Sequence, residues 1–295
     1  MGMLCGIGAA VAYGTNLLGA LKLYAVGMPT GCVLFYRFSL AFVLMGIVLW
    51  VRGENLFVTR RELAVVTLLG LLFSASSLTL YLSFHYIEAG VASTILFVYP
   101  VITAAIMAVF FKEKITWNTV VSILLARVGV VLLYWTGSTG RLSTAGVVLV
   151  LISALTYAVY IVTVDRARLS LSAFKINFYV LFYCALSMVV YSLVSGQPLM
   201  WPPTAESWFY VGWLALVPAI LALVLMVYAA QYVGSTTTAV LGALEPLTAV
   251  VLGIVVFGES FSARLAVGIV FVLSAVVVIA LGRKPEENRV RNESV

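Results

Sequence analysis

Ten long runs of apolar residues, separated by short connections that hold most of the charged residues, account for almost the whole chain. Each run has about twenty residues, which is the length that a helix needs to cross a hydrocarbon core of roughly 30 Å. The chain lacks the alternation of polar and apolar residues that marks membrane β-strands, and a helix satisfies its own backbone hydrogen bonds in lipid. We therefore predict an all-α integral membrane protein with ten transmembrane helices, at 4–24, 31–51, 63–84, 90–111, 116–135, 142–164, 174–194, 208–230, 234–257 and 264–282.

The second half of the chain repeats features of the first half at a nearly constant separation. The matched polar and proline positions, 144 or 146 residues apart, are Tyr13 with Tyr157, Asn16 with Tyr160, His85 with Gln231, Pro100 with Pro246 and Glu113 with Glu259. Because five spans per repeat is an odd number, the second repeat must enter the membrane in the opposite orientation. Such inverted repeats recur in secondary transporters, whose substrate site lies near the midplane between the repeats. We expect five-helix repeats at 1–137 and 138–282, the second inverted, and a polar cytoplasmic tail at 283–295.

The composition excludes a water-soluble domain of this length, since 63% of the residues are hydrophobic, 9% are charged and the mean hydropathy is +1.15. Twelve Lys and Arg residues fall in the connections on one side of the membrane, and only Lys22, Arg141 and Arg264 fall on the other. Because these residues are retained in the cytoplasm when they lie in short loops, we predict that both termini are cytoplasmic. The same bias accounts for the net charge of +6, so no nucleic-acid partner is implied.

The cysteines and the single histidine exclude most catalytic chemistry. Cys5, Cys32 and Cys184 lie in or beside apolar spans, and their odd number and wide spacing fit neither a disulfide framework nor a zinc site. His85 is the only histidine, and the chain has neither a phosphate-binding loop nor an HExxH motif. We expect no enzyme activity, no metal and no cofactor. The first apolar run follows no basic segment and is longer than a signal-peptide core, so we predict a retained first helix.

Glu245 lies near the middle of the ninth span, where a carboxylate needs a partner or a function. In a functional interpretation, its protonation couples to substrate movement, or its carboxylate binds a substrate ammonium. In a structural interpretation, an arginine neutralises it between packed helices. The first repeat has Tyr99 at the equivalent position, so the predicted site is asymmetric. Glu259 lies at a helix end, where we expect a structural role.

Arg37 is a candidate partner for Glu245 or for the carboxylate of a substrate, because a guanidinium combines charge with bidentate geometry. It lies near the outer end of the second span, so the alternative is that its side chain extends to the lipid head groups. Arg127, in the fifth span, is a second candidate partner. The sequence does not decide which arginine pairs with the carboxylate.

Aromatic and amide side chains are the other candidates for a cavity between the repeats. Rings with polar tips can stack on a partly apolar substrate, although tyrosines at helix ends also form the ordinary interfacial belt, and a packing role is the alternative for His85. The candidate cavity residues besides Arg37 and Glu245 are Tyr13, Asn16, Tyr81, His85, Tyr99, Tyr157, Tyr160, Tyr228 and Gln231. Candidate hinges, with static kinks as the alternative, are Pro100, Pro218 and Pro246, each of which removes a backbone donor within a span.

Several features of the two repeats together resemble one known family. They are Tyr13-Gly14 with Lys22 eight residues later, Arg37 in the second span, and a central proline followed by Lys112-Glu113 or Gly258-Glu259 at the end of each repeat. In these features the chain resembles the EamA-type transporters of the drug/metabolite transporter superfamily, over nearly its whole length. It departs from them at Tyr13, where the family often has Trp, and at Lys112, where it usually has Gly.

The resemblance implies a ten-helix fold with a central cavity lined largely by the first, third, fourth, sixth, eighth and ninth helices, and export of small metabolites, often amino acids. It also places the fifth helix at the periphery, which favours a structural or interface role for Arg127. We therefore predict a secondary transporter of the bacterial inner membrane that exports amino acids or related compounds by alternating access, with proton coupling as an option. The expected partners are a small-molecule substrate and the lipid bilayer, in a monomer or a homodimer. The alternatives are a passive channel, a structural membrane subunit and a membrane-embedded enzyme.

Overall fold

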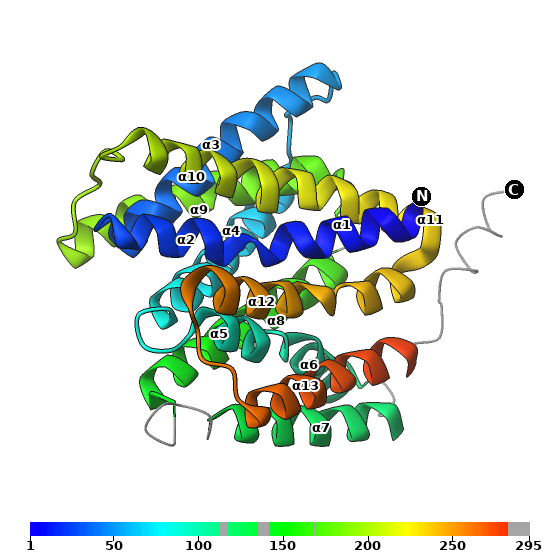
Figure 1. The fold of residues 1–295 in the computed structure, drawn as a ribbon. Helices are drawn as coiled ribbons and strands as arrows, with labels where there is room; N and C mark the ends of the chain where they lie inside the picture. The colour runs from blue at the N-terminus through cyan, green and yellow to red at the C-terminus, as the bar shows by residue number, and fades with distance from the viewer. Residues whose placement is uncertain (113–116, 135–141, 168, 283–295) are drawn as a thin grey trace, which may run out of the picture.

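The computed structural model describes residues 1–112, 117–134, 142–167 and 169–282, and over these residues the secondary structure is helical, without a strand. The N-terminus and the end of α13 lie at the same end of the bundle (Figure 1). The elements are α1 (Gly2–Gly14), α2 (Asn16–Ala25), α3 (Thr30–Val51), α4 (Arg60–Ser83), α5 (Ala89–Leu96), α6 (Tyr99–Phe111), α7 (Trp117–Tyr134), α8 (Thr144–Ala167), α9 (Ala173–Ser195), α10 (Ala205–Leu216), the π-helix η1 (Val217–Leu221), α11 (Ala222–Leu241), α12 (Leu244–Phe257) and α13 (Ala263–Gly282).

These elements form ten membrane-spanning segments in two inverted repeats of five, so the predicted fold class is confirmed. Within the described parts of the chain, seven segments are long and apolar enough to cross a membrane. The other three, Trp117–Leu133, Leu244–Phe257 and Ala263–Val278, are apolar but shorter. Four of the predicted spans consist of more than one element, because the chain breaks or changes helix type inside them.

The reversal between the eighth and ninth spans occurs within α11. A Cβ atom placed on Gly6 would lie 3.4 Å from Cβ of Leu241 and 3.5 Å from Cβ of Ala229. A straight helix would separate these two residues by about 18 Å. The chain therefore bends back inside this element, as the yellow and gold ribbon shows at the right of Figure 1.

Two of the candidate hinge prolines mark the start of a new helix rather than a kink in a continuous one. Pro100 lies in the first turn of α6 and Pro246 in the first turn of α12, each after a two-residue turn. Proline suits this position, because its missing N–H has no intrahelical acceptor there. Pro218 lies in η1, a π-helical segment between α10 and α11. The fourth and ninth spans are therefore interrupted near their middles.

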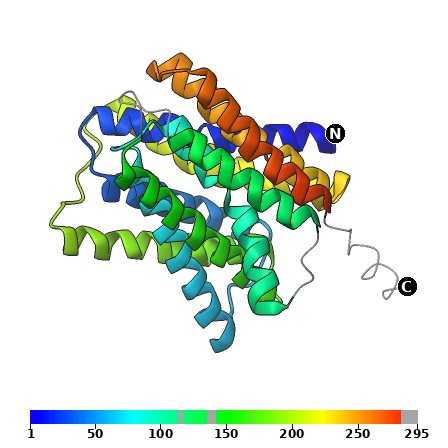
Figure 2. The same ribbon diagram turned by 90° about the horizontal axis from the view of Figure 1, so that it is seen from below.

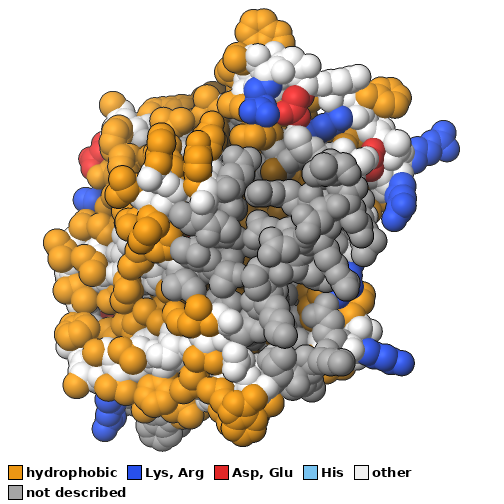
Figure 3. Space-filling view, turned by 90° about the vertical axis from the view of Figure 1, so that its right-hand side faces the viewer, with side chains coloured by type: hydrophobic (Ala, Val, Ile, Leu, Met, Phe, Trp, Pro, Cys, Tyr) orange, Lys and Arg blue, Asp and Glu red, His pale blue; other side chains and the backbone are white. Residues whose placement is uncertain are grey.

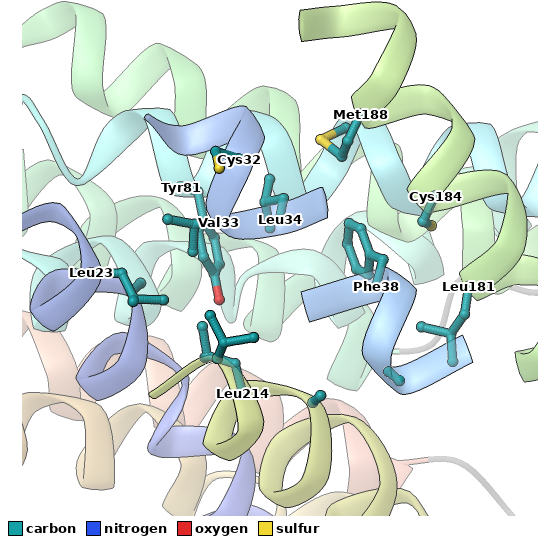
Figure 4. Packing of buried hydrophobic residues seen from close by; sticks show 14 of the residues in the cluster. Leu23, Cys32, Val33, Leu34, Phe38, Tyr81, Leu181, Cys184, Met188 and Leu214 are labelled. Carbon is teal, nitrogen blue, oxygen red and sulfur yellow. The ribbon is translucent and has the colours of Figure 1, made fainter. Parts of the chain in front are cut away.

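Helices of the two repeats interleave, and neither repeat packs as a separate bundle. α3 packs against α9, and α4 packs against both α8 and α9, whereas α1 packs against α11 and α12. One of the two main core clusters draws on α2, α3, α4, α9 and α10, and part of it is shown in Figure 4. There the Tyr81 ring lies beside Val33, with its hydroxyl directed toward Leu214. Cys32 and Cys184 are buried in the same cluster, as expected for small apolar side chains.

α7 and α13 lie side by side (Figure 2). A Cβ atom on Gly129 would lie 3.0 Å from the carbonyl oxygen of Gly268, so the helices approach closely where neither carries a side chain. Arg127 is exposed on α7, away from the core. This position agrees with the structural or interface role expected for Arg127 at the periphery.

Carboxylates tie the two repeats together at one end of the bundle. Glu259, between α12 and α13, accepts hydrogen bonds from the backbone N–H groups of Ala89 at 2.7 Å and of Gly90 at 3.1 Å, at the start of α5. Glu88 accepts hydrogen bonds from the N–H group of Ser260 at 3.2 Å and from its hydroxyl at 2.6 Å. Burial raises the pKa of Glu259, and the two N–H groups oppose that rise. The structural role expected for Glu259 is therefore a cap on α5; the matched Glu113 lies outside the described residues.

α6 and α12, which occupy equivalent positions in the two repeats, end in the same way. Gly258 follows α12 with φ +67°, and Lys112 follows α6 with φ +55°. Both are left-handed conformations, which glycine adopts freely and other residues adopt at a cost. Lys112 is the one non-glycine residue with positive φ in the described part of the chain.

Candidate functional site

A cavity of about 110 Å³, measured as the space open to the centre of a water molecule, lies between the two repeats. One water needs roughly 10–15 Å³ by this measure, so the cavity admits several waters or part of a small solute. Its wall contains the six spans that the resemblance implies and, in addition, the second span. The lining residues are Tyr13, Asn16, Arg37, Phe73, Ser76, Ser77, Leu80, Tyr81, Leu96, Tyr99, Tyr157, Met226 and Glu245.

A break in the first span turns Tyr13 and Asn16 toward this cavity from two different helices. The break lies at Thr15, whose hydroxyl donates to the carbonyl of Ala12 at 2.7 Å and accepts from the indole N–H of Trp213 at 3.2 Å. A hydroxyl that bonds back to the preceding turn competes with the helical backbone. The spacing of Tyr13 and Asn16 is therefore not that of one continuous helix, although both side chains line the cavity.

Gly14 allows α1 to pack directly on α12 beside Glu245. A Cβ atom at Gly14 would lie 2.7 Å from the carbonyl oxygen of Glu245 and 2.5 Å from Cβ of Thr248. Only glycine fits this close approach of one helix to another. The contact places the neighbouring Tyr13 at the first turn of α12, where Glu245 enters the cavity.

Arg37 is held inside the bundle by a hydrogen-bonded chain. Its Nη1 donates to the hydroxyl of Tyr81 at 2.7 Å, and that hydroxyl donates to Oδ1 of Asn16 at 3.1 Å. The guanidinium carbon lies 5.5 Å from the ring centroids of both Phe38 and Tyr81, which is within range of cation–π attraction. The residue is only 5% exposed, so its side chain does not extend to the lipid head groups.

The guanidinium of Arg37 is incompletely paired. Its Nε is enclosed without a hydrogen-bond partner. No carboxylate of the described residues lies within the 4.0 Å of an ion pair with it. A buried cation without a counter-ion is costly, so the Arg37 guanidinium would be stabilised by an anionic group bound at the cavity wall.

Glu245 is the negative group of the same cavity. Among the described side chains and backbone groups, none donates a hydrogen bond to its carboxylate or forms an ion pair with it. Arg37 acts on it electrostatically at longer range. The ion pair of the structural interpretation is therefore not formed in this structure.

Aromatic rings surround the carboxylate. Tyr13, Tyr99 and Tyr157 line the same cavity as Glu245, and their hydroxyls have no hydrogen-bond partner among the described groups. The rings of Tyr99 and Tyr157 meet edge to face with centroids 4.6 Å apart. Tyr160 stacks on Tyr157 at 5.7 Å with an interplanar angle of 7°, so it supports the wall from behind without lining the cavity.

Two other candidates lie away from the cavity, which corrects their prediction as cavity residues. His85 is exposed in the turn after α4, where its Nε2 lies 3.0 Å from the hydroxyl of Thr30 and its ring stacks on Tyr24 at 4.5 Å. Partial burial lowers the pKa of His85. Tyr228 is 48% exposed on α11, where it faces outward. Its side chain therefore points away from the bundle, as a tyrosine of the interfacial belt would; the side chain of Gln231 lies outside the described ones.

The cavity also contains residues that the sequence did not single out. Ser76 and Ser77 face it from α4, and the Ser76 hydroxyl lies 3.0 Å from the hydroxyl of Ser153 on α8. Two adjacent serines in an apolar span were an available signal, because a buried hydroxyl needs a partner. The aliphatic wall, including Leu80, Leu96 and Met226, gave no such signal, since apolar residues occupy every face of these spans. In the searched residues, no three His, Cys, Asp or Glu side chains are grouped to hold a metal.

Comparisons with known proteins find relatives over most of the chain. Proteins named "Uncharacterized transporter" include one from Clostridium kluyveri, 22% identical over 77% of this chain and 75% of its own length, and one from Archaeoglobus fulgidus, 27% identical over 72% and 75%. The "Uncharacterized inner membrane transporter YedA" of Escherichia coli K12 is 27% identical over 84% of this chain and 80% of its own. A solved structure described as "Crystal structure of protein" has a TM-score of 0.67 and 18% identity, covering 95% of this chain and 96% of that one, which supports the fold.

The family model matches nearly the whole chain. The EamA-like transporter family matches residues 1–135 and 144–281, which include both repeats and every residue that lines the cavity. The fold, the paired matches and the named relatives all indicate a membrane transporter. The chain therefore belongs to the EamA-like transporter family.

Proposed function

We propose that this transporter exports a small metabolite, an amino acid or a related compound, by alternating access. The observation that carries the proposal is the unpaired carboxylate of Glu245 in a cavity whose wall comes from both inverted repeats. In inverted-repeat transporters, exchanging the conformations of the two halves moves the opening from one side of the membrane to the other. A cavity between the halves is where a substrate would be carried.

Glu245 also supports coupling to protons in this proposal. A carboxylate away from water is stable when it is protonated or when a cation neutralises it. A substrate ammonium and a proton would then compete for Glu245, so the outward step of one would be linked to the inward step of the other. The competition requires that no protein cation pairs with Glu245, and no described Lys or Arg does so.

The helix breaks at Pro100 and Pro246 are the proposed bending points, and Pro218 in η1 is a third. Bending at the first two would close opposite ends of the cavity in turn. The test replaces each proline with Ala and measures the reactivity of introduced cysteines from both sides of the membrane. If neither replacement shifts the balance between the two sides, the prolines are static.

We also propose that both termini face the cytoplasm of a bacterial inner membrane. The twelve Lys and Arg residues grouped on one side support this orientation. Figure 3 views the end of the bundle that carries the N-terminus, and Lys and Arg side chains stand around its rim. Labelling of cysteines placed in the connections of intact cells tests the orientation.

Counterflow in proteoliposomes tests the transport proposal. Vesicles that hold a high concentration of unlabelled amino acid should accumulate the labelled compound transiently, and the initial rate should saturate. A passive channel would equilibrate the label without accumulation, and a structural subunit or an enzyme would give no flux above that of protein-free vesicles. Either result would reject alternating access for the compounds tested.

A further inference from the structure

We propose that the connection between α3 and α4, together with the helix ends on either side of it, binds an anionic phospholipid at the membrane surface. In this assignment, Arg60 and Arg61 hold the phosphate of the head group, and the rings of Trp50 and Phe57 lie among the acyl chains. None of these residues lines the central cavity, so the inference does not depend on the proposed transport function.

The connection, residues 52–59, is fixed in shape by hydrogen bonds to α9. The backbone carbonyl of Leu56 accepts a hydrogen bond from the hydroxyl of Tyr179, and the carbonyl of Phe57 accepts one from Nζ of Lys175. These bonds use the backbone of the connection, so they leave the side chains of Leu56 and Phe57 unengaged. Phe57 is 81% exposed although its backbone is anchored. The connection therefore presents an apolar ring outward from a fixed position.

The carboxylates of this segment already have partners within the protein. Glu54 accepts hydrogen bonds from the hydroxyl of Ser172 and from Nε of Arg52, the latter at 2.9 Å. Glu62 accepts hydrogen bonds from the N–H group and the hydroxyl of Thr59, at 2.8 Å each, as part of the capping box that begins α4. Neither carboxylate is therefore available to a further cation without losing one of these bonds.

Arg60 and Arg61 occupy the first two positions of α4, where a cation is disfavoured. The N–H groups at the start of a helix carry a partial positive charge, which repels cations. Both arginines are exposed, and within the described residues neither guanidinium has a hydrogen bond or an ion pair. An anion bound beside them would relieve this repulsion. Phosphate suits the position, because its oxygens accept paired hydrogen bonds from a guanidinium.

The apolar side chains of the same segment indicate that the phosphate belongs to a lipid. Trp50 is 81% exposed and Val51 is 75% exposed, and they precede the connection as Phe57 precedes the two arginines. α3 and α4 are both long and apolar enough to cross the membrane, so the connection between them lies at the membrane surface. Aromatic rings are favoured at this depth. A free phosphate would leave these side chains in water, whereas a phospholipid would cover them.

The surroundings of the segment favour an anionic head group over a zwitterionic one. The end of α3 projects beyond its neighbours in Figure 1, and Figure 3 shows hydrophobic side chains next to Lys and Arg side chains at its upper edge. A zwitterionic head group would bring an ammonium beside Arg60 and Arg61, where the nearby carboxylates are already engaged. An anionic head group brings no such charge. In the proposed orientation, the segment faces the inner leaflet, although binding to the purified protein does not depend on that orientation.

Lipid binding to the purified, delipidated protein in detergent tests the assignment. Native mass spectrometry gives dissociation constants for dioctanoyl phosphatidylglycerol and dioctanoyl phosphatidylcholine, which share their acyl chains and differ in net charge. Phosphatidylglycerol should bind about 10-fold or more tightly, because each arginine near an anionic lipid contributes to the attraction. Equal dissociation constants would overturn the assignment.

A pair of double substitutions locates the charge preference. Arg60→Gln with Arg61→Gln should bring the two dissociation constants within about 3-fold of each other. Arg127→Gln with Arg264→Gln removes the same charge from exposed positions elsewhere, so it should keep the full preference for phosphatidylglycerol. A preference that survives the first pair, or that the second pair abolishes equally, would overturn the assignment.

Phe57→Ser tests the contact with the acyl chains. Both lipids should bind about 5-fold or more weakly to this variant, and their ratio should stay the same, because the ring contacts the chains that the two lipids share. Inorganic phosphate at the same concentration should not displace phosphatidylglycerol from the parent protein. Unchanged affinities in Phe57→Ser, or displacement by phosphate, would mean that the site holds a free anion and not a lipid.

Thermal unfolding separates lipid binding from a structural role of the arginines. Without lipid, the protein with Arg60→Gln and Arg61→Gln should melt at or above the temperature of the parent protein, because cations oppose the start of α4. Added phosphatidylglycerol should raise the melting temperature of the parent more than that of the variant. A variant that melts well below the parent without lipid would show that the arginines stabilise the protein itself, and the lipid site would be rejected.

Discussion

The interrupted helices of the two repeats break at matched positions and differ in the side chain that stands at the break. α6 begins at Tyr99 with Pro100 behind it, and α12 carries Glu245 and Pro246 in its first turn. Both breaks open onto the same cavity. The break before α6 contributes the neutral phenol of Tyr99, and the break before α12 contributes the carboxylate of Glu245. The repeated backbone therefore builds the cavity, and the departure from the repeat gives it a charge.

A second difference lies at the ends of the same helices. Gly253 on α12 leaves room for the Glu259 carboxylate, whereas Met107 stands at the equivalent position of α6. α12 is followed by Gly258 and α6 by Lys112, and both residues adopt left-handed backbone conformations. The second repeat thus has the residues best suited to this helix end. The first repeat uses the same geometry with less suitable ones.

Making the second repeat resemble the first should have the largest effect. Glu245→Tyr removes the only negative charge of the cavity wall, so the affinity for an amino-acid substrate should fall about 10- to 100-fold, as expected for loss of a hydrogen-bonded charge. Tyr99→Phe removes only a hydroxyl and should cost less than about 10-fold. Dissociation constants of the two variants measure the contrast. Equal losses would show that the carboxylate has no special role.

Gly253→Ala should lower the free energy of unfolding by about 1–3 kcal/mol, because the displaced carboxylate loses its backbone donors. A Cβ atom at this position would lie 2.1 Å from Oε2 of Glu259, which is anchored to Ala89 and Gly90. Gly212→Ala is the matched control: nothing lies within 4 Å of its Cβ position, and the helix should gain about 0.5–1 kcal/mol. Denaturation in detergent compares the two.

A double substitution sharpens this test. In a Glu259→Ala background the carboxylate is gone, so Gly253→Ala should cost less than it does alone. An unchanged cost would assign the strain to helix packing instead of to the tether between α12 and α5.

Lys112→Gly should stabilise the protein by about 1 kcal/mol, because glycine adopts φ +55° without the steric cost that a side chain imposes. The substitution would place glycine after α6, as Gly258 stands after α12, so the two helix ends would no longer differ in backbone strain. Gly258→Lys at the equivalent position should have the opposite sign. A loss of stability in Lys112→Gly would mean that the lysine side chain stabilises this helix end by more than the strain costs.

The smallest expected effects are opposite pH dependences of two carboxylates outside the spans. The pKa of Glu259 is raised by burial, so its contribution to stability is present below the ordinary glutamate pKa and is lost as the pH rises through the raised value. The pKa of Glu54 is lowered by hydrogen bonds from Ser172 and Arg52, so its contribution is present above the ordinary pKa and is lost as the pH falls through the lowered value. Melting temperatures of Glu259→Gln and Glu54→Gln against pH should therefore deviate from the parent protein on opposite sides of the ordinary glutamate pKa, by a few degrees at most.

The arrangement of the spans and much of the cavity could be predicted from the sequence. Apolar runs of membrane length locate the ten segments, and the polar matches between the halves locate the cavity wall. Of the eleven candidate cavity residues, seven line one cavity: Tyr13, Asn16, Arg37, Tyr81, Tyr99, Tyr157 and Glu245. Polar residues in an apolar span carry information because lipid tolerates them poorly.

The remaining features depend on the direction of side chains and on tertiary contacts. A span that is apolar on every face has no periodicity to separate its interior side from its lipid side, so Tyr228 was indistinguishable from Tyr81. The hydrogen bond of Arg37 to Tyr81 joins residues 44 positions apart, and no local sequence pattern predicts it. At the break in the first span, the Thr15 hydroxyl accepts a hydrogen bond from the indole of Trp213, which lies 198 positions away.

We propose that Glu245, and not its counterpart Tyr99, couples protons to transport. The direct measurement compares pH-gradient-driven flux with substrate exchange at equal pH, in proteoliposomes that hold the parent protein, Glu245→Gln or Tyr99→Phe. Glu245→Gln should lose the response to the gradient and keep exchange, while Tyr99→Phe should keep both. If the flux of Glu245→Gln still follows the pH gradient as that of the parent protein does, Glu245 is not the coupling residue.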